Sequence, residues 1–269
     1  DGANIVYDQG GTVAGGTRNT AGTDDADPAS ALNATIAGGL GNQASAEGST
    51  VGGGAGNIAD GHVATVGGGW VNTASGAEAT VGGGGENSAG GDYATAGGGY
   101  SNEAHGRGST VGGGIDNQSS FSATVSGGEG NAADGNWSTV GGGYRNDASQ
   151  TYATVSGGAS NHASGYSSAI GGGSNQAAMG EFSTVAGGLS NQATSMGATI
   201  GGGGAVASVI ESFGNTASGD YSTIAGGAQN TADGWCAAIP GGINNFAGGQ
   251  YSLAAGNRAK AYNDGCFVW

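Results

Sequence analysis

Three histidines are the first residues to test for chemistry, because an imidazole can act as an acid, a base or a metal ligand near neutral pH. His62, His105 and His162 stand five, three and one residues after the asparagine that precedes each of them. A catalytic triad or a metal site needs such side chains to converge on one point. Their unequal offsets indicate no shared site, and we interpret them as solvated surface residues.

Carboxylates offer two further chemistries. A glycosidase needs two carboxyl groups about 5–10 Å apart, but the acidic residues of successive repeats do not align, as in the pairs Asp134 with Asp147 and Asp220 with Asp233. A separate acidic cluster could bind Ca²⁺ through oxygen ligands, although it lacks the EF-hand spacing and the repeat of calcium β-rolls. This cluster can be interpreted either as a structural calcium site or as a plain solvated acidic loop. It consists of Asp24, Asp25 and Asp27.

Two other motifs concern phosphate and redox chemistry. The Gly-Gly-Gly runs lack the lysine of a phosphate-binding loop, since the only lysine is Lys260. Cys236 and Cys266 are the only cysteines, and an even pair in a secreted chain predicts a disulfide. Such a bridge would tie the last residues to the preceding repeats. A bridge between chains and two free thiols are the alternatives.

Composition narrows the classes of protein further. Of 269 residues 65 are glycine, and 20 acidic side chains against 5 basic ones give a net charge of −15. So few cations cannot neutralise phosphates, which argues against nucleic acid and an anionic membrane surface as partners. No apolar stretch is long enough to span a membrane. Residues 1–20 show no signal peptide, and in a secreted protein we expect Asp1 to be the mature start.

The element that must position all these residues is a 15-residue repeat. Residues 57–71, 72–86 and 87–101 follow the consensus N-x-A-x-G-x-x-A/S-T-V/I-x-G-G-x-x, with Ala96 at the V/I position of the third. Two intervals between apolar anchors are longer than 15 residues, which predicts loop insertions near 20–34 and 201–213. We therefore expect one repeat domain over 1–255 and a non-repeating tail over 256–269.

Fifteen residues with two turn signals leave room for two short strands and no helix. Threonine and valine favour strands, and glycine suits the corners. The chain is thus predicted to be an all-β parallel β-solenoid of about 16 coils, roughly 75 Å long at the usual strand spacing. Identical residues then form ladders, with the threonine column facing away from the valine column. The ladder residues include Asn57, Asn72, Asn87, Asn102, Val51, Val66, Val81 and Val111.

The core of each coil is thin. One buried valine contributes roughly 1.5–3 kcal/mol, whereas ordering fifteen residues costs on the order of 15–30 kcal/mol. We therefore expect burial between chains and a folded unit that is not a lone monomer. Large apolar residues recur just after the glycine corner, where they predict subunit contact, packing on their neighbours, or a receptor or glycan surface. They include Trp70, Tyr100, Ile115, Tyr144 and Leu189.

The pattern N-x-A-x-G-x-Y/F/W-A/S-x-V/I-x-G resembles the head repeat of trimeric autotransporter adhesins, over essentially the whole chain. This resemblance implies left-handed parallel β-rolls associated in threes. The repeat here is one residue longer and richer in glycine, which is similar to repeats of bacterial and phage fibre proteins. The segment GNRAKAYNDGCFVW resembles the one that such fibres place before a C-terminal chaperone domain.

These observations lead to a functional expectation: a non-enzymatic fibre protein, extracellular, on a cell surface or on a virion. It would act as a structural or adhesive element. Its partner would be a further copy of itself, side by side or end to end, together with a host surface or glycan. No cofactor is expected beyond the calcium considered above. The alternatives are an ice-binding solenoid that uses the threonine ladder, and a fibre that binds or cleaves polysaccharide.

Overall fold

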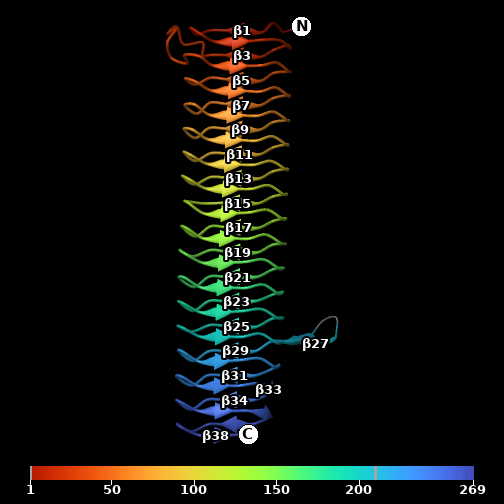
Figure 1. The fold of residues 1–269 in the computed structure, drawn as a ribbon, viewed down its shortest axis with the longest axis vertical. Coiled ribbons are helices and arrows are strands. Elements are labelled where there is room, and N and C mark those ends of the chain that lie inside the picture. Colours follow the sequence, from red (N-terminus) through yellow and green to blue (C-terminus); the bar gives the residue numbers. More distant parts are fainter. Residues whose placement is uncertain (1, 209–210) are drawn as a thin grey trace. The chain divides into compact units, whose positions relative to one another are not determined.

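The computed structural model describes residues 2–208 and 211–269, and it forms two compact units, Asp1–Asn131 (unit 1) and Ala132–Trp269 (unit 2). All regular elements in the described residues are β-strands, most of them two residues long. None of these residues forms a helix that could cross a membrane. Within each unit the chain winds in coils that stack on one another (Figure 1). The predicted all-β parallel solenoid is confirmed, with about 17 turns in the described chain rather than 16.

Each coil of unit 1 contributes one strand to each of two parallel sheets. The strands after the asparagines form the alanine sheet: β1 (Ile5–Val6), β3 (Thr20–Ala21), β5 (Gln43–Ala44), β7 (Ile58–Ala59), β9 (Thr73–Ala74), β11 (Ser88–Ala89), β13 (Glu103–Ala104) and β15 (Gln118–Ser119). The other strands form the threonine sheet: β2 (Thr12–Val13), β4 (Thr35–Ile36), β6 (Thr50–Val51), β8 (Thr65–Val66), β10 (Thr80–Val81), β12 (Thr95–Ala96), β14 (Thr110–Val111) and β16 (Thr124–Val125).

Unit 2 repeats this arrangement. Its alanine sheet contains β17 (Ala132–Ala133), β19 (Asp147–Ala148), β21 (His162–Ala163), β23 (Ala177–Ala178), β25 (Gln192–Ala193), β29 (Thr216–Ala217), β31 (Thr231–Ala232), β34 (Phe246–Ala247) and β37 (Lys260–Ala261). Its threonine sheet contains β18 (Thr139–Val140), β20 (Thr154–Val155), β22 (Ala169–Ile170), β24 (Thr184–Val185), β26 (Thr199–Ile200), β30 (Thr223–Ile224), β32 (Ala238–Ile239), β35 (Leu253–Ala254) and β38 (Phe267–Val268).

Side-chain alternation in these strands separates a buried face from an outer face. The second residue of nearly every strand points into the coil, and Val51, Val66, Val81 and Val111 are fully buried. The threonine before each valine is only half-buried, as in β6 to β10. The predicted opposition of the valine and threonine columns is therefore confirmed. Because alanine fills the facing strand, the core of a coil contains few large side chains.

The asparagine column is a saturated, buried hydrogen-bond ladder. The side-chain Nδ2 of Asn72 donates to Oδ1 of Asn57 in the preceding coil at 3.1 Å, and to two glycine carbonyl oxygens at 2.9 Å. Its own Oδ1 accepts the backbone N–H and the Nδ2 of Asn87 at 3.0 and 3.1 Å. The same pattern runs through Asn57 and Asn102, so the predicted amide ladder is confirmed. A buried amide satisfied in this way avoids the desolvation cost of an unpaired polar group.

The corners of the coils use left-handed backbone conformations, and many of them are not at glycine. Gly54 has φ +86°, and a Cβ there would collide with the carbonyl oxygen of Gly69 in the next coil, so this corner requires glycine. Two other corner positions hold non-glycine residues with φ near +55°, such as Trp137 and Ser160. Glycine thus supplies only some of the left-handed corners, and regular coil-to-coil hydrogen bonds hold the strained non-glycine residues in place at the others.

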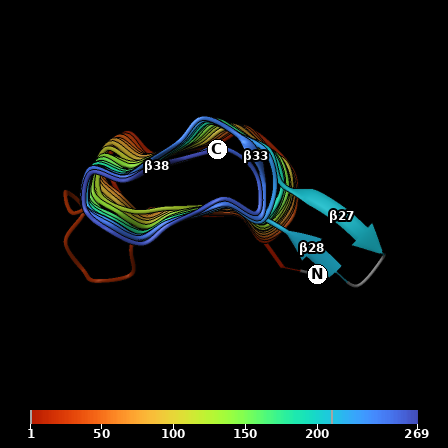
Figure 2. The same cartoon turned by 90° about the horizontal axis from the view of Figure 1, so that it is seen from below.

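Both predicted insertions leave the solenoid between strands. Residues 22–33 form a loop between β3 and β4 of unit 1. In unit 2, β27 (Ala205–Ser208) and β28 (Glu211–Phe213) form an antiparallel hairpin that stands out from the coils (Figures 1 and 2). Asn215 follows the hairpin and returns to the asparagine ladder, bonding Asn191 at 3.0 Å. An insertion at a corner therefore leaves the ladder register unchanged.

The C-terminal residues extend the solenoid. The segment 256–269, which we expected to be a tail outside the repeat, contributes β36 (Gly256–Asn257), β37 and β38 to a further coil. β36 pairs with β33 (Gly242–Ile243) at the glycine corner, and β38 pairs with β35. The segment does not match the repeat pattern because Ala259 stands at the position of the asparagine. The backbone N–H of Ala259 still donates to Oδ1 of Asn245, but alanine has no amide to continue the ladder.

Candidate interaction surfaces

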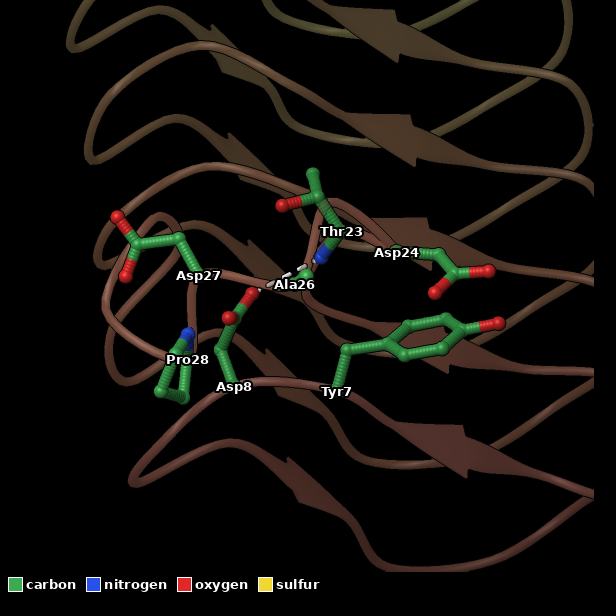
Figure 3. A pocket seen from close by; sticks show the side chains of 7 residues that line it. All are labelled: Tyr7, Asp8, Thr23, Asp24, Ala26, Asp27 and Pro28. Atoms are coloured by element: carbon green, nitrogen blue, oxygen red, sulfur yellow. Dashed lines mark hydrogen bonds between the residues drawn. The ribbon is translucent and has the colours of Figure 1, made fainter.

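A cavity of about 230 Å³ lies beside the insertion of unit 1 (Figure 3). Its floor holds the carboxylate of Asp8, which is 5% exposed. Oδ2 of Asp8 accepts the backbone N–H of Thr23 at 2.9 Å, and the hydroxyl of Ser30 lies 3.4 Å from its Oδ1. The carboxylate is thus satisfied by donors of the loop itself. Its evident role is to fasten the loop to the first coil.

The acidic cluster beside this cavity is not arranged as a metal site. Oδ1 of Asp25 accepts the backbone N–H of Asp27 at 2.9 Å, and Oδ1 of Asp27 accepts that of Ala29 at 3.0 Å. The bond from Asp27 contributes most to lowering the pKa of Asp25, and the hydroxyl groups of Ser30 and Thr23 lower it further. Within residues 2–208 and 211–269 no three acidic, histidine or cysteine residues are grouped to hold a metal ion. The predicted calcium site at Asp24, Asp25 and Asp27 therefore gains no support.

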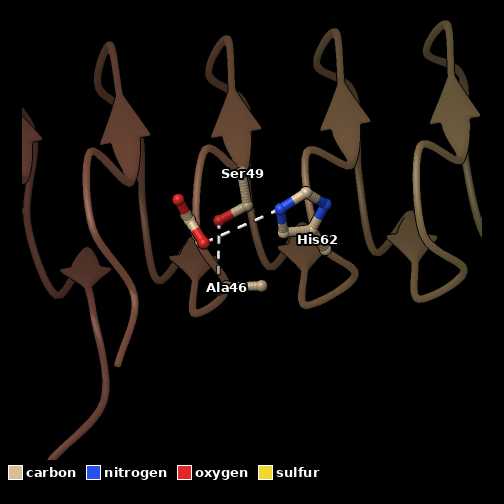
Figure 4. Close-up of polar contacts among 4 residues, drawn as sticks. Ala46, Ser49 and His62 are labelled. Atoms are coloured by element: carbon tan, nitrogen blue, oxygen red, sulfur yellow. Dashed lines mark hydrogen bonds and ion pairs between the residues drawn. The ribbon is translucent and has the colours of Figure 1, made fainter. Parts of the chain in front are cut away.

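Each histidine faces its own carboxylate. Nε2 of His62 lies 3.7 Å from Glu47 of the preceding coil, at an exposed corner where the Ser49 hydroxyl also accepts the backbone N–H of Ala46 (Figure 4). His105 similarly faces Glu103 at 3.3 Å, within one coil. These contacts are half-exposed and isolated from one another along the chain. They have the form of surface ion pairs, which contribute at most about 1 kcal/mol each.

The third histidine belongs to a more buried group in unit 2. Nδ1 of His162 lies 2.8 Å from Oδ2 of Asp147, its partner in the parallel register of β19 and β21. Oδ1 of Asp147 is buried without a hydrogen bond. Burial raises the pKa of Asp147, the contact with His162 partly opposes this, and the charge of Asp134 adds to the rise. The strand register pairs Asp147 with Ala132, so the predicted lack of alignment between Asp134 and Asp147 is confirmed.

The two cysteines do not form the predicted disulfide; both are free thiols and half-buried. Cys236 sits at a left-handed corner with φ 54°, and the coil that contains Tyr251 lies between it and the coil of Cys266. Backbone bonds mark this order, since Tyr251 bonds Trp235 and Gly265 bonds Gln250, each at 2.8 Å. Two coil steps of about 4.8 Å exceed the Cα separation that a disulfide tolerates.

An apolar stripe follows the glycine corner of unit 1, and we call it the corner stripe. Neighbouring members pair in parallel from coil to coil, with a small residue between each pair of large ones except at Tyr100 and Ile115, which are direct neighbours. The rings of Trp70 and Tyr100 both approach Gly85 between them, with ring carbons 3.6 and 3.3 Å from the point where a Cβ would lie. Even so, Trp70 is 52% exposed and Tyr100 is 45% exposed. The large members are Leu40, Trp70, Tyr100 and Ile115.

Unit 2 continues the same corner position in a weaker form. Tyr144 is exposed, and the guanidinium of Arg145 lies 4.9 Å from its ring centre. Leu189 is half-buried rather than exposed. The structure thus places all five predicted interface residues at one corner position of the coil. Trp70, Tyr100 and Ile115 are brought together in unit 1, and Tyr144 and Leu189 are three coils apart in unit 2.

The opposite corner of unit 2 carries an aromatic ladder that sequence reasoning did not assign to a surface. Trp137 and Tyr152 are stacked with ring centres 5.4 Å apart, and Tyr166 and Phe182 continue the series edge to face at 5.8 and 5.6 Å. All four are exposed by two fifths or more. Only the first pair is stacked face to face, and the ring planes of the next two pairs are nearly perpendicular. The sequence signal for it was an aromatic residue two positions before the strand threonine, as at Trp137, Tyr152 and Phe182.

The outer face of the threonine sheet in unit 1 is the most regular surface of the molecule. Threonine occupies the outward position of each even-numbered strand from β2 to β16, and every adjacent pair of these strands is in parallel register. The next outward position along each coil is exposed and holds only small residues. These are Ala14, Ala37, Gly52, Gly67, Gly82, Gly97, Gly112 and Ser126.

No protein-family model and no curated protein sequence matches the chain. Its class is thus defined by the parallel β-solenoid and by the surfaces described above.

Proposed function

We propose that this protein is a non-enzymatic, extracellular fibre element, on a cell or a virion, that associates with further copies of itself. The observation that carries the proposal is the corner stripe of unit 1. It displays four large apolar side chains in register on the outside of a solenoid whose own core is thin. Host surface or glycan contact would then be a property of the assembled fibre.

The exposure of the stripe supports a partner of the same chain. Leu40 and Ile115 are 51% and 46% exposed, comparable with the two aromatic residues between them. Contiguous exposed apolar residues usually mark an interaction site, and aromatic residues are enriched at the centres of interfaces. A regular solenoid offers the same stripe to each copy, so an isologous or cyclic contact can use one set of residues.

Three features support a role other than catalysis. The carboxylate at the floor of the cavity already accepts hydrogen bonds from the loop that surrounds it. The histidines are each occupied by a separate carboxylate. Asp147 lies beside His162, on the outer face of the alanine sheet in unit 2, and it does not line that cavity.

Sedimentation velocity and electron microscopy of the purified chain test the proposal. We expect oligomers or filaments for the unaltered chain, and a shift toward monomer for the double variant Trp70→Ser, Tyr100→Ser. The matched control is Tyr93→Ser at the opposite corner, where Tyr93 is equally exposed at 51%. A monodisperse monomer at all concentrations would refute self-association, and equal assembly of both variants would exclude the corner stripe as the contact.

A further inference from the structure

The threonine face of unit 1 is uniform in a way that the fold does not require. In unit 2 the same position is held by Ala169, Ala238 and Leu253, and the parallel pairing of the threonine sheet continues through them. The backbone geometry of the coil thus accepts other side chains at this position. Strand propensity favours threonine only modestly, so it does not explain an uninterrupted series in unit 1.

The alanine sheet of the same unit gives an internal comparison. Its outer positions are also half-exposed strand residues in parallel register, but they vary freely in size and charge. They include isoleucine, serine, glutamine and glutamate, at Ile58, Ser88, Gln43 and Glu103. A solvated strand face in this protein therefore does not become threonine by default. The uniformity is confined to one face.

This face is also free of charge in a chain of net charge −15. The threonines and the small residues beside them include no acidic or basic side chain, and none of the latter is larger than serine. A Cβ at Gly52 would collide with the carbonyl oxygen of Gly67, and the same holds from Gly67 to Gly82. The glycine column therefore keeps the surface flat beside the threonines.

The hydroxyl groups on this face are available for an external partner. Among the described residues of this series, the hydroxyl of Thr35 donates to a protein acceptor, the carbonyl oxygen of Asn33 at 3.2 Å. Thr65, Thr80 and Thr95 in the middle of the series make no such bond. Their β-branched side chains are stiff at χ1, so the hydroxyl and methyl groups are already ordered. Binding through them would cost little additional side-chain entropy.

The spacing selects the kind of partner. Adjacent strands lie about 4.8 Å apart, so the series from Thr12 to Thr124 spans roughly 34 Å with one hydroxyl and one methyl group per step. Oxygen rows in hexagonal ice repeat at a distance close to this strand spacing. A flat, uncharged array of that period can anchor ordered water through the hydroxyls and seat the methyl groups between the waters. We propose that the threonine face of unit 1 binds the surface of an ice crystal.

The test uses the full chain and two single substitutions. Thr80→Leu lies in the centre of the face, at a position where Leu253 shows that leucine fits the fold. Thr73→Leu is the matched control, because Thr73 is a half-buried threonine on the outer face of the alanine sheet. Thermal hysteresis, and partition of labelled protein into a growing ice hemisphere, measure binding. Circular dichroism melting verifies that both variants fold.

We expect hysteresis and incorporation into ice for the unaltered chain and for Thr73→Leu, and loss of most of both signals for folded Thr80→Leu. Exclusion of the unaltered chain from ice would overturn the proposal, as would equal activity of the two variants. A decrease in oligomer size for Thr80→Leu without any effect on ice would identify the face as a chain contact and would also overturn it. The corner-stripe variants report on self-association separately, so failure of one proposal is distinguishable from failure of the other.

Discussion

Gln176 is the one position in the middle of the buried amide column where glutamine replaces asparagine. Its backbone N–H and Oε1 keep the ladder contacts, to Asn161 at 3.0 Å and from Asn191 at 2.9 Å. Its Nε2, however, is buried without a hydrogen-bond acceptor, because the extra methylene carries the amide past the positions that an asparagine Nδ2 reaches. Leaving such a donor unpaired costs about 1–3 kcal/mol.

We therefore expect Gln176→Asn to increase the free energy of unfolding by about 1–3 kcal/mol. In the regular pattern, the new Nδ2 would bond Oδ1 of Asn161 and the carbonyl oxygens of Gly172 and Gly188, as Asn72 does with its counterparts. Urea unfolding followed by tryptophan fluorescence measures the change. Because a solenoid need not unfold in one step, hydrogen exchange of residues 161–191 localises it.

The reverse substitution is the control. Asn72→Gln places the longer amide in a fully bonded part of unit 1, and we expect it to destabilise that unit by a similar amount. If Gln176→Asn lowers stability, packing space and not hydrogen bonding decides this position. If neither variant changes the unfolding curve, the amide ladder does not stabilise the coils and the reasoning is refuted.

Three other substitutions test separate features. Ser109 has a buried hydroxyl without a partner, so Ser109→Ala should be neutral or stabilising by up to about 1 kcal/mol in urea unfolding; a clear loss would mean that the hydroxyl is bonded. Ser160 holds φ 55°, a conformation that costs about 1–2 kcal/mol outside glycine, so Ser160→Gly should raise the melting temperature. Burial raises the pKa of Asp147, and His162 partly opposes the rise. Protonation of Asp147 therefore stabilises the fold at low pH, and this stabilisation is lost as the pH rises through the raised pKa. Asp147→Asn, which keeps an oxygen acceptor for His162, should therefore melt higher than the unaltered chain near neutral pH and equally below the ordinary value of 3.8; a pH-independent difference would contradict this.

The repeat predicts the fold well because one pattern constrains every coil. A valine and an asparagine at fixed distances must each meet their counterparts above and below, so their burial follows from the period alone. Val66 and Asn57 are buried as expected. Register survives even in the coil that is one residue short, where Thr124 pairs with Thr110, because the deletion falls at a corner.

The predictions that were wrong concern individual side chains whose contacts do not follow from the repeat. The pairing of Cys236 with Cys266 depends on how many coils separate them, and the sequence pattern failed to show that residues 256–269 form another coil. Left-handed corners at Trp137 or Tyr152 contradict local propensity, and only the hydrogen bonds between coils explain them.

The parallel ladders have a mechanical consequence. Apart from the hairpin β27–β28, the backbone hydrogen bonds between strands of the described residues run from one coil to the next. Tension applied along a unit therefore loads these bonds directly, and a coil that detaches leaves its neighbour intact as the new end. Each 15-residue coil would release about 50 Å of extended chain. Pulling on a single molecule should therefore lengthen it in nearly equal steps of that size, interrupted by two longer steps where the loop 22–33 and the hairpin β27–β28 are released with their coils.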